Sequence, residues 1–474
     1  MTDPLTLLNL QPARPPRLEK NFLPAALWNR AYRALVAEDR TARPLALALV
    51  RPDGSAARQQ TRVLGREHPA AYLNLTYIER LLKFLLWQKG GSKVLVAGAP
   101  ELAAQLAAIY APGAARAFDY AFMGEKVYGR PFSVAAADFD ELPGDQVAVL
   151  PLGRNLDGCR IGFDLGGSDR KAAAVIDGRV VFSEEIPWNP YFEQDPAYHI
   201  EGVQDSLRRA AVHLPRVDAI GGSAAGVYVN NEVRVASLFR GVPPERFDRE
   251  IRRMFFTLQE RWGGVPFEVA NDGEVTALAG SMSLGDGAVL GVSLGTSQAG
   301  GYVTSGGGIT SWLNELAFAP VDYHPDAPRD EWSGDRGCGV QYFSQQGVGR
   351  LARAAGFDFP SDQPLPEQLV AVQSAMAKGD PRAGAIYESI GAAFGYSVAH
   401  YADFYELRHV LVLGRVTSGA GGDVILDEAQ AVLRAEFPAL AETIRLHTPN
   451  EHDKRHGQAI AAASLPSLRK KISP

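Results

Sequence analysis

The stretch Ile161-Gly-Phe-Asp164-Leu-Gly166-Gly167-Ser168-Asp-Arg-Lys171-Ala-Ala-Ala-Val175 decides the fold that we expect for this chain. The pattern predicts an apolar strand, a glycine turn and a second apolar strand, with Asp164 where the first strand ends. Glycine lets main-chain N–H groups approach a phosphate, and a carboxylate at this place can hold a hydrated Mg²⁺. The stretch is neither a P-loop nor a dinucleotide-binding turn, because the required spacings of glycines are missing. The alternative is a β-hairpin whose Asp and Gly residues serve only the turn.

A second stretch, Ala288-Val-Leu-Gly-Val-Ser-Leu-Gly295-Thr296-Ser297-Gln-Ala-Gly-Gly-Tyr-Val303, repeats this strand, turn and strand roughly 130 residues later. Its loop offers backbone donors and two hydroxyl groups to a phosphate, although a plain hairpin turn is the alternative. The repetition predicts an internally duplicated domain that holds a nucleotide between its halves.

A third glycine-rich turn follows the apolar run Leu411 to Leu413 and contains Gly414, Gly421 and Gly422. Glycines there would let a flat heterocycle lie against the backbone, so we interpret the turn as an adenosine site. The alternative is a flexible loop.

Asn271-Asp272-Gly273 lies where an apolar strand gives way to a helix, which is the usual place for reactive groups in an α/β sheet. A carboxylate there could accept the proton of a substrate hydroxyl that attacks the γ-phosphorus of ATP. The alternative is a helix N-cap, a position that Asn and Asp favour.

Composition limits the class of protein. A chain of 474 residues with 46% hydrophobic and 22% charged residues predicts a soluble globular protein of two or three domains. The net charge of −6 argues against a nucleic-acid partner. Cys159 and Cys338 stand alone, so neither a disulfide framework nor a CxxC metal site is expected. The sequence shows no signal peptide and no apolar run of about 18 residues, so we expect no membrane association and a cytoplasmic location.

The first part of the chain, residues 1–155, is expected to form an accessory domain of α/β or α+β type. A hairpin is predicted over residues 44–63, and an apolar helix over Leu75 to Trp87 that stops at Gly90. We interpret the aromatic residues of this helix as core. The sequence predicts no role for this domain.

The motifs DLGGSDRK, AND, SLGTSQAGGYV and LGRVTSGAGGDVIL, in this order, resemble those of the actin, heat-shock-chaperone and sugar-kinase superfamily. Within it the chain is most similar to the ROK proteins (repressors, uncharacterised frames and sugar kinases), over about Arg160 to Ser464. The resemblance implies a duplicated ribonuclease-H-like, actin-like ATPase domain of two lobes over residues 156–474.

The resemblance also implies roles for particular residues. Asp164 would organise Mg²⁺, Asp272 would be the general base, and Asn271 would bind a sugar hydroxyl, with Glu315 a second substrate-binding residue. The phosphates and adenosine of ATP would be held by a larger set: Gly166, Gly167, Ser168, Lys171, Gly295, Thr296, Ser297, Gly414, Gly421 and Gly422.

The chain also departs from the ROK pattern. Sugar-phosphorylating members carry GExGH and CxCGxxGCxE segments, but here Asn314-Glu315-Leu316-Ala317-Phe318 ends in Phe318 where histidine belongs. Cys338 alone remains of the cysteines, and Val340 replaces a sugar-binding glutamate. We therefore predict no structural zinc. The N-terminal part also lacks the helix-turn-helix of a ROK repressor.

These observations predict an ATP- and Mg²⁺-dependent kinase that phosphorylates a sugar or similar polyol. The rival prediction is a non-catalytic ROK-like sensor that binds a sugar or nucleotide, favoured by the missing His and Glu. A third is an ATPase that drives a partner, but the dehydratase activators of that kind bind an iron–sulfur cluster through cysteines, and two isolated cysteines argue against it. The sequence leaves the oligomeric state open and allows a homodimer.

Overall fold

The computed structural model describes residues 10–146, 149–150, 152–448 and 457–468. The chain divides into two compact units. Unit 1 comprises Met1–Ala148, Val292–Gly300 and Ser311–His447, and unit 2 comprises Val149–Gly291, Gly301–Thr310 and Thr448–Pro474. The N-terminal region (residues 10–146) is thus part of the same compact unit as most of the last third of the chain. Its separation as an accessory domain ending near residue 155 stays a prediction.

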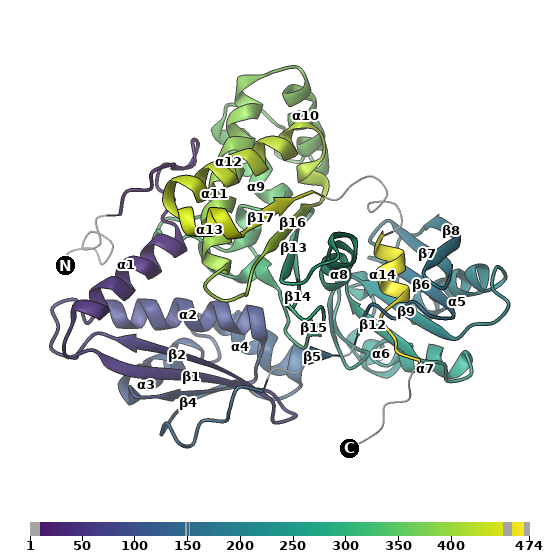
Figure 1. Cartoon of the computed structure of the whole chain (residues 1–474), viewed down its shortest axis with the longest axis horizontal. Helices are drawn as coiled ribbons and strands as arrows, with labels where there is room; N and C mark the ends of the chain where they lie inside the picture. Colours follow the sequence, from purple (N-terminus) through teal and green to yellow (C-terminus); the bar gives the residue numbers. More distant parts are fainter. Residues whose placement is uncertain (1–9, 147–148, 151, 449–456, 469–474) are drawn as a thin grey trace. The chain divides into compact units, whose positions relative to one another are not determined.

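Unit 2 contains a five-stranded mixed sheet in the order β12-β9-β6-β7-β8 (Figure 1). Strands β6, β7 and β8 form an antiparallel meander, whereas β6, β9 and β12 run parallel. The strand, glycine turn and strand predicted over residues 161–175 are therefore confirmed. The strands are β6 Cys159–Leu165, β7 Asp169–Ile176, β8 Arg179–Pro187, β9 Ala219–Ala224 and β12 Phe267–Asn271.

Helices cover this sheet in unit 2. Helices α5 and α7 contribute to an apolar core that includes Phe163 of β6 and Leu207 of α5. The short helix α14 packs directly on β6 and β9. The contact is so close that a Cβ atom at Gly162 or Gly221 would collide with carbonyl oxygens of α14. The helices of unit 2 are α5 Pro196–Ala211, α6 Pro244–Arg246, α7 Met254–Arg261, α8 Asp272–Leu284 and α14 Gln458–Ala463, and a small hairpin joins β10 Val227–Val229 to β11 Glu232–Val235.

The N-terminal region forms a four-stranded sheet in the order β2-β1-β3-β4, with β1 and β2 as the predicted hairpin. Helix α2 packs against β1 and α3, and α3 packs against β3 and β4. Helix α2 ends at Gly90, whose φ of 76° suits glycine. The elements are α1 Ala25–Glu38, β1 Arg43–Val50, β2 Ala56–Val63, α2 Leu73–Lys89, β3 Lys93–Ala97, α3 Pro100–Ile109, α4 Ala117–Ala121, the π-helical η2 Phe122–Tyr128 and β4 Ser133–Ala137.

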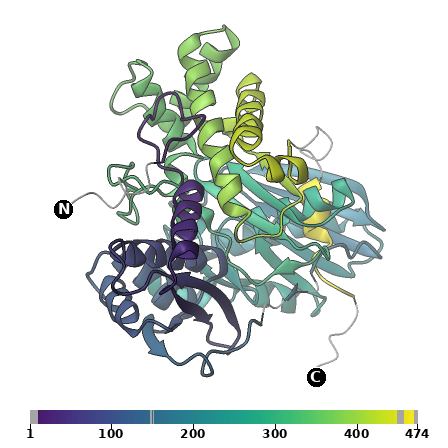
Figure 2. The ribbon, with the colours of Figure 1, turned by 60° about the vertical axis from the view of Figure 1, so that its left-hand side comes forward.

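The remainder of unit 1 is mainly helical. Helix α11 packs along α12, and α1 of the N-terminal region contacts α11 (Figure 2). Strands β16 and β17 pair in parallel. The elements are α9 Gln345–Ala354, α10 Leu365–Ala377, α11 Pro381–Tyr401, β16 His409–Leu413, α12 Ala420–Glu436, α13 Pro438–Thr443 and β17 Arg445–His447.

The predicted second strand, turn and strand is also present, as β13 Val289–Leu294 and β14 Gln298–Val303. The chain passes from unit 2 to unit 1 within β13 and returns within β14. In unit 2, Val303 of β14 pairs with β15 (Ile309–Thr310), which pairs with β5 (Val149–Leu150). Among the residues described above, none of the helices has the length and apolar character needed to cross a membrane.

Candidate functional site

The first predicted phosphate loop is a tight turn between β6 and β7. The N–H of Gly166 donates to the carbonyl of Asp169 at 2.9 Å. Trp188 holds the turn from outside, because its Nε1 donates to the carbonyl of Gly166 at 2.8 Å and its N–H to that of Ser168 at 3.0 Å. Nζ of Lys171 lies 3.6 Å from Oδ1 of Asp169, so its ammonium group forms an ion pair with a carboxylate at the end of the turn.

Gly167 has a neighbour that explains why the residue is glycine. A Cβ atom at this position would collide with the hydroxyl of Tyr191. Tyr191 in turn carries the guanidinium of Arg240 on its ring face, 4.3 Å from the ring centroid. An aromatic residue therefore lies beside the predicted phosphate loop and carries a cation on its ring, and no pattern in the sequence had pointed to either residue.

Asp164 is a buried carboxylate with two polar neighbours. Oγ of Ser223 donates to its Oδ1 at 2.6 Å, and Nε2 of Gln458 lies 3.4 Å from the same oxygen. Burial raises the pKa of Asp164 to about 6, and the charge of Asp272 adds to the increase, whereas the Ser223 hydrogen bond opposes it. A cation at this carboxylate would offset both the burial and the repulsion.

Asp272 and Asn271 lie at the amino end of α8. Oδ1 of Asn271 accepts from the N–H of Gly273 at 2.8 Å, and its Nδ2 donates to the carbonyl of Gly226 at 2.7 Å. Asn271 is therefore the N-cap that the alternative interpretation described, and a sugar hydroxyl would have to use its remaining hydrogen-bonding capacity. Burial raises the pKa of Asp272, opposed by the hydrogen bond from the N–H of Gly273.

The second predicted phosphate loop belongs to unit 1. The N–H of Gly295 donates to the carbonyl of Ser297 at 3.0 Å, and the carbonyl of Gly295 accepts from the N–H of Gln345 at 2.9 Å. Thr296 and Ser297 are exposed at the tip. The loop is thus fixed at its base by α9 and presents two hydroxyl-bearing residues to solvent.

The predicted adenosine glycines lie in the same unit. Gly414 has a φ of 104°, and a Cβ atom there would collide with the backbone of Leu294, so this turn adjoins the second phosphate loop. Gly421 is in close contact with the ring of Tyr387, and Gly422 with the carbonyl of Thr417. Both of these glycines are accounted for by contacts within the protein, and their contact with adenosine stays a prediction.

The segment Asn314–Phe318 has a different environment from the one that a sugar-binding histidine would need. The N–H of Glu315 donates to the carbonyl of Trp87 at 2.9 Å. Phe318 packs against aromatic rings, with its centroid 4.4 Å from that of Trp87. The surroundings of residue 318 are therefore apolar and suit a phenylalanine side chain.

The predicted site residues divide between the two units. Unit 2 contains the first phosphate loop, Asp164, Asn271 and Asp272. Unit 1 contains the second phosphate loop, the adenosine glycines and Glu315. Within the described residues, no group of three or more His, Cys, Asp or Glu side chains is arranged to hold a metal ion. A hydrated Mg²⁺ needs no such group, because it is bound through one or two carboxylates, waters and phosphates. Asp164 fits that requirement.

Ser223 and Gln458 are polar neighbours of Asp164 that were not predicted from the sequence. The signal for Ser223 was available in part, since it lies in the glycine-rich segment that ends a predicted strand. Parallel pairing of β6 with β9 sets Ser223 directly beside Asp164. Gln458 carries no comparable pattern.

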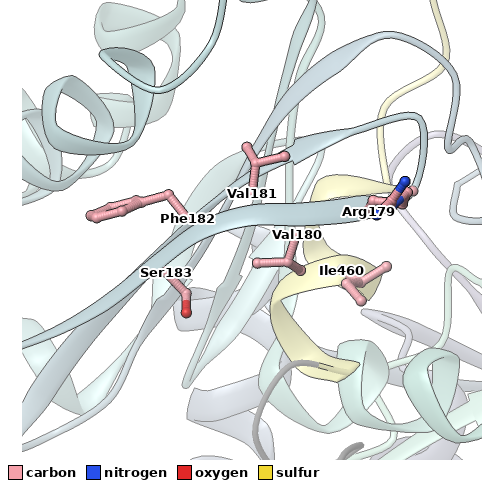
Figure 3. Close-up of a pocket in the computed structure, with 7 residues that line it drawn as sticks. Arg179, Val180, Val181, Phe182, Ser183 and Ile460 are labelled. Atoms are coloured by element: carbon pink, nitrogen blue, oxygen red, sulfur yellow. The ribbon is translucent and has the colours of Figure 1, made fainter.

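A pocket of about 550 Å³ lies elsewhere in unit 2, along β8 (Figure 3). Val180 of β8 and Ile460 of α14 lie close together on its wall, while Phe182 points away from them (Figure 3). None of the predicted site residues lines this pocket. The pocket therefore supports no part of the predicted site.

Comparison with known proteins identifies the fold. No family model matches the chain, and no curated protein matches it. Among solved structures, the ROK hexokinase from Thermus thermophilus has a TM-score of 0.51 at 21% identity and covers 64% of this chain and 96% of its own. A ROK family glucokinase from Streptomyces griseus, in complex with glucose and AMPPNP, has a TM-score of 0.48 at 20% identity, covering 65% and 98%. A ROK family transcriptional regulator, a homolog of the E. coli MLC protein, has a TM-score of 0.49 at 18% identity, covering 71% and 81%.

At this level of identity the hexokinase match shows a shared fold, and it covers 64% of the chain. The α/β architecture and the paired strand-turn-strand units agree with it. The chain therefore has the fold of the ROK proteins, a duplicated actin-like ATPase fold, with an additional N-terminal region.

Proposed function

We propose that the protein is an ATP- and Mg²⁺-dependent phosphotransferase that transfers the γ-phosphoryl group to a hydroxyl of a sugar or similar polyol. One observation carries the proposal. Asp272 directly follows β12 and Asp164 lies near the carboxyl end of β6, so both carboxylates lie at the edge of the sheet where the parallel strands β6, β9 and β12 end. A base and a metal-binding carboxylate at the ends of strands in one sheet are what phosphoryl transfer to an alcohol requires.

The reaction places distinct demands on these residues. The substrate hydroxyl oxygen would form the new bond to the γ-phosphorus while the bond to the ADP oxygen breaks. The hydroxyl proton would pass to a carboxylate oxygen of Asp272, whose raised pKa makes it a better acceptor than an exposed aspartate. Bound Mg²⁺ would neutralise charge on the phosphates, and Asp164 would hold it.

The same proposal assigns the remaining predicted residues. Asn271 and Glu315 would orient the sugar. The ATP phosphates would lie against two loops, and adenosine against the glycine turn after β16; these groups comprise Gly166, Gly167, Ser168, Lys171, Gly295, Thr296, Ser297, Gly414, Gly421 and Gly422. The proposal also includes a cytoplasmic location and no nucleic-acid or membrane partner.

A second candidate function is a non-catalytic sensor that binds a sugar or nucleotide. The observation that favours it is Phe318, which packs among aromatic rings where sugar-phosphorylating ROK proteins carry a histidine. The retained Asp272 favours the kinase.

ADP release from Mg²⁺-ATP, measured against a panel of sugars and polyols, tests the proposal. We expect one substrate class to stimulate turnover, and Asp272→Asn to reduce it by about 10²- to 10⁴-fold with nucleotide affinity unchanged. Asp248→Asn, which alters an exposed aspartate of the same unit, is the matched control and should retain full activity. Full activity in Asp272→Asn would refute the assignment of the base. No stimulation by any substrate, with ATP still bound, would support the sensor.

A further inference from the structure

Two segments of unit 1, 314–318 and 334–340, correspond to the GExGH segment and the cysteine-rich zinc motif of the ROK kinases that the chain resembles. Their residues do not fit a zinc ion. Phe318 and Val340 carry no donor atom, and Cys338 is fully buried, with burial raising the pKa of its thiol. Zinc binds thiolate sulfur in sites of four ligands, and a single protonated thiol does not supply one. Other groups must therefore hold these segments.

An ionic cluster joins the second segment to the N-terminal region. Arg80 Nη1 lies 3.2 Å from Asp335 Oδ2, Lys83 Nζ lies 3.4 Å from the same oxygen, and Arg116 Nη1 lies 2.5 Å from Asp335 Oδ1. Glu79 and Asp119 complete the cluster, with Lys83 Nζ 2.8 Å from Asp119 Oδ1. The cluster comprises Glu79, Arg80, Lys83, Arg116, Asp119 and Asp335, so three cations balance three anions.

Burial makes this balance important. Lys83 is 0% exposed and Asp335 is 7% exposed. Burial alone would lower the pKa of Lys83, but Asp119 and Asp335 outweigh it and raise the pKa, so the lysine stays charged. Removing one member of such a cluster leaves an uncompensated buried charge, which is strongly unfavourable. Asp335 is therefore held firmly against α2.

An aromatic cluster joins the first segment to the same helix. It comprises Trp87, Phe118, Phe122 and Phe318. The ring of Phe318 lies 4.4 Å from that of Trp87 and 5.3 Å from that of Phe118. Trp87 is itself fixed by the ionic cluster, because its Nε1 donates to Asp119 Oδ1 at 2.5 Å. The two clusters thus meet at Asp119.

The backbone of the first segment is bound to the end of α2. The N–H of Asn314 donates to the carbonyl of Gln88, and the N–H of Glu315 to the carbonyl of Trp87, both at 2.9 Å. Carbonyls in the last turn of a helix have no partner within the helix, so they are free to accept these hydrogen bonds. The position of the Glu315 backbone therefore depends directly on α2.

We propose that α2 and the ionic and aromatic clusters hold segments 314–318 and 334–340 in place without a metal ion, and that they position Glu315 for the substrate. Lys83, Trp87 and Asp335 are positioning residues in this scheme. The N-terminal region is then a structural part of the substrate site. The role of Glu315 rests on the proposed kinase function, whereas the attachment of 314–315 to α2 can be tested independently of activity.

The test uses the full-length chain and the variant Lys83→Met, which leaves the ionic cluster with one excess negative charge. We expect faster hydrogen exchange at the amides of Asn314 and Glu315. We also expect a KM for the sugar about tenfold or more higher, because small displacements of a binding group have large effects, while the KM for ATP stays within about twofold. The double variant Lys83→Met/Asp335→Asn restores the charge balance of the cluster. We expect it to reverse part of the increase in hydrogen exchange and part of the increase in the KM for the sugar.

Arg43→Met is the matched control, because Arg43 pairs with Glu101 in the same region without contacting either segment. It should leave the exchange of Asn314 and Glu315 and the KM for the sugar unchanged. If Lys83→Met does not fold, Trp87→Phe replaces it, since it keeps a ring but loses the hydrogen bond to Asp119.

Three results would overturn the proposal. The first is unchanged exchange at Asn314 and Glu315 in a folded Lys83→Met or Trp87→Phe protein. The second is an equal increase in exchange in Arg43→Met. The third is a loss of thermal stability or a rise in the KM for the sugar when the wild type is treated with a zinc chelator. If the wild type phosphorylates no sugar, the proposed function fails, and the exchange measurements still decide whether α2 holds the segment.

Discussion

Replacing Asp164 by asparagine is expected to stabilise the protein at neutral and higher pH while removing its Mg²⁺-dependent binding of nucleotide. The amide side chain of the variant would be neutral at every pH, whereas the wild-type carboxylate must be charged in a buried place beside Asp272. The amide oxygen of asparagine can still accept the hydrogen bond from Ser223. The substitution therefore removes the unfavourable charge and little else.

The size of the effect follows from the pKa of Asp164, about 6 in the folded protein against an ordinary value of 3.8. Because the folded state holds the proton more tightly, the contribution of Asp164 to stability is greatest below about pH 4 and is lost as the pH rises through 6. At about 1.4 kcal/mol for each tenfold change in proton affinity, the total loss is about 3 kcal/mol. Asp164→Asn should then be more stable than the wild type by up to about 3 kcal/mol at about pH 8, and by under about 1 kcal/mol at about pH 4.

Thermal unfolding in metal-free buffer measures this difference. For a unit of this size, about 3 kcal/mol corresponds to an increase in Tm of about 6 to 12 °C at the higher pH. Asp248→Asn, in an exposed place in the same unit, is the control and should change stability by less than about 0.5 kcal/mol. The reasoning is refuted if Asp164→Asn is no more stable than the wild type at high pH, or if the difference between the two proteins does not depend on pH.

Other substitutions give further expected outcomes. Ser223→Ala removes a hydrogen bond that lowers the pKa of Asp164, so the pH of half-maximal Mg²⁺-nucleotide binding, measured by calorimetry, should move upward; no movement would mean that Asp164 does not bind the metal. Gly414→Ala introduces a Cβ that collides with Leu294 at a φ of 104°, and unfolding experiments should show a loss of at least about 1 kcal/mol. Gly384→Ala, at a helical position with open space around it, should instead gain about 0.5 to 1 kcal/mol, and a loss there would contradict the packing around α11.

Local patterns in the sequence were sufficient to predict much of the fold. The strand, glycine turn and strand around Asp164 followed from the alternation of apolar runs and glycines, and the end of α2 followed from Gly90. The N-cap at Asn271 was recognised as an alternative to a substrate-binding role. These features depend on residues close together in the chain, which is why a single sequence predicts them.

Contacts between distant segments could not be predicted in this way. Ser223 lies beside Asp164 only because β6 and β9 pair in parallel with a particular register, across 59 residues of chain. The helix α2 was predicted from the spacing of its apolar residues alone. The charged residues between them were not recognised as buried. Lys83 is buried because Asp119 and Asp335 neutralise its charge. The sequence of α2 gives no indication that these two carboxylates lie next to Lys83.

The ionic cluster also has a consequence for how the chain is made. Arg80 and its partner Asp335 are 255 residues apart in the sequence. At a synthesis rate of about 5 to 20 residues per second, roughly 10 to 50 s pass between their appearance on the ribosome. During that time the three cations of the ionic cluster, Arg80, Lys83 and Arg116, have only the carboxylates of Glu79 and Asp119 as partners, and the last turn of α2 lacks the amides of residues 314 and 315. The region around α2 therefore reaches its final structure only after residues 314–335 have been synthesised.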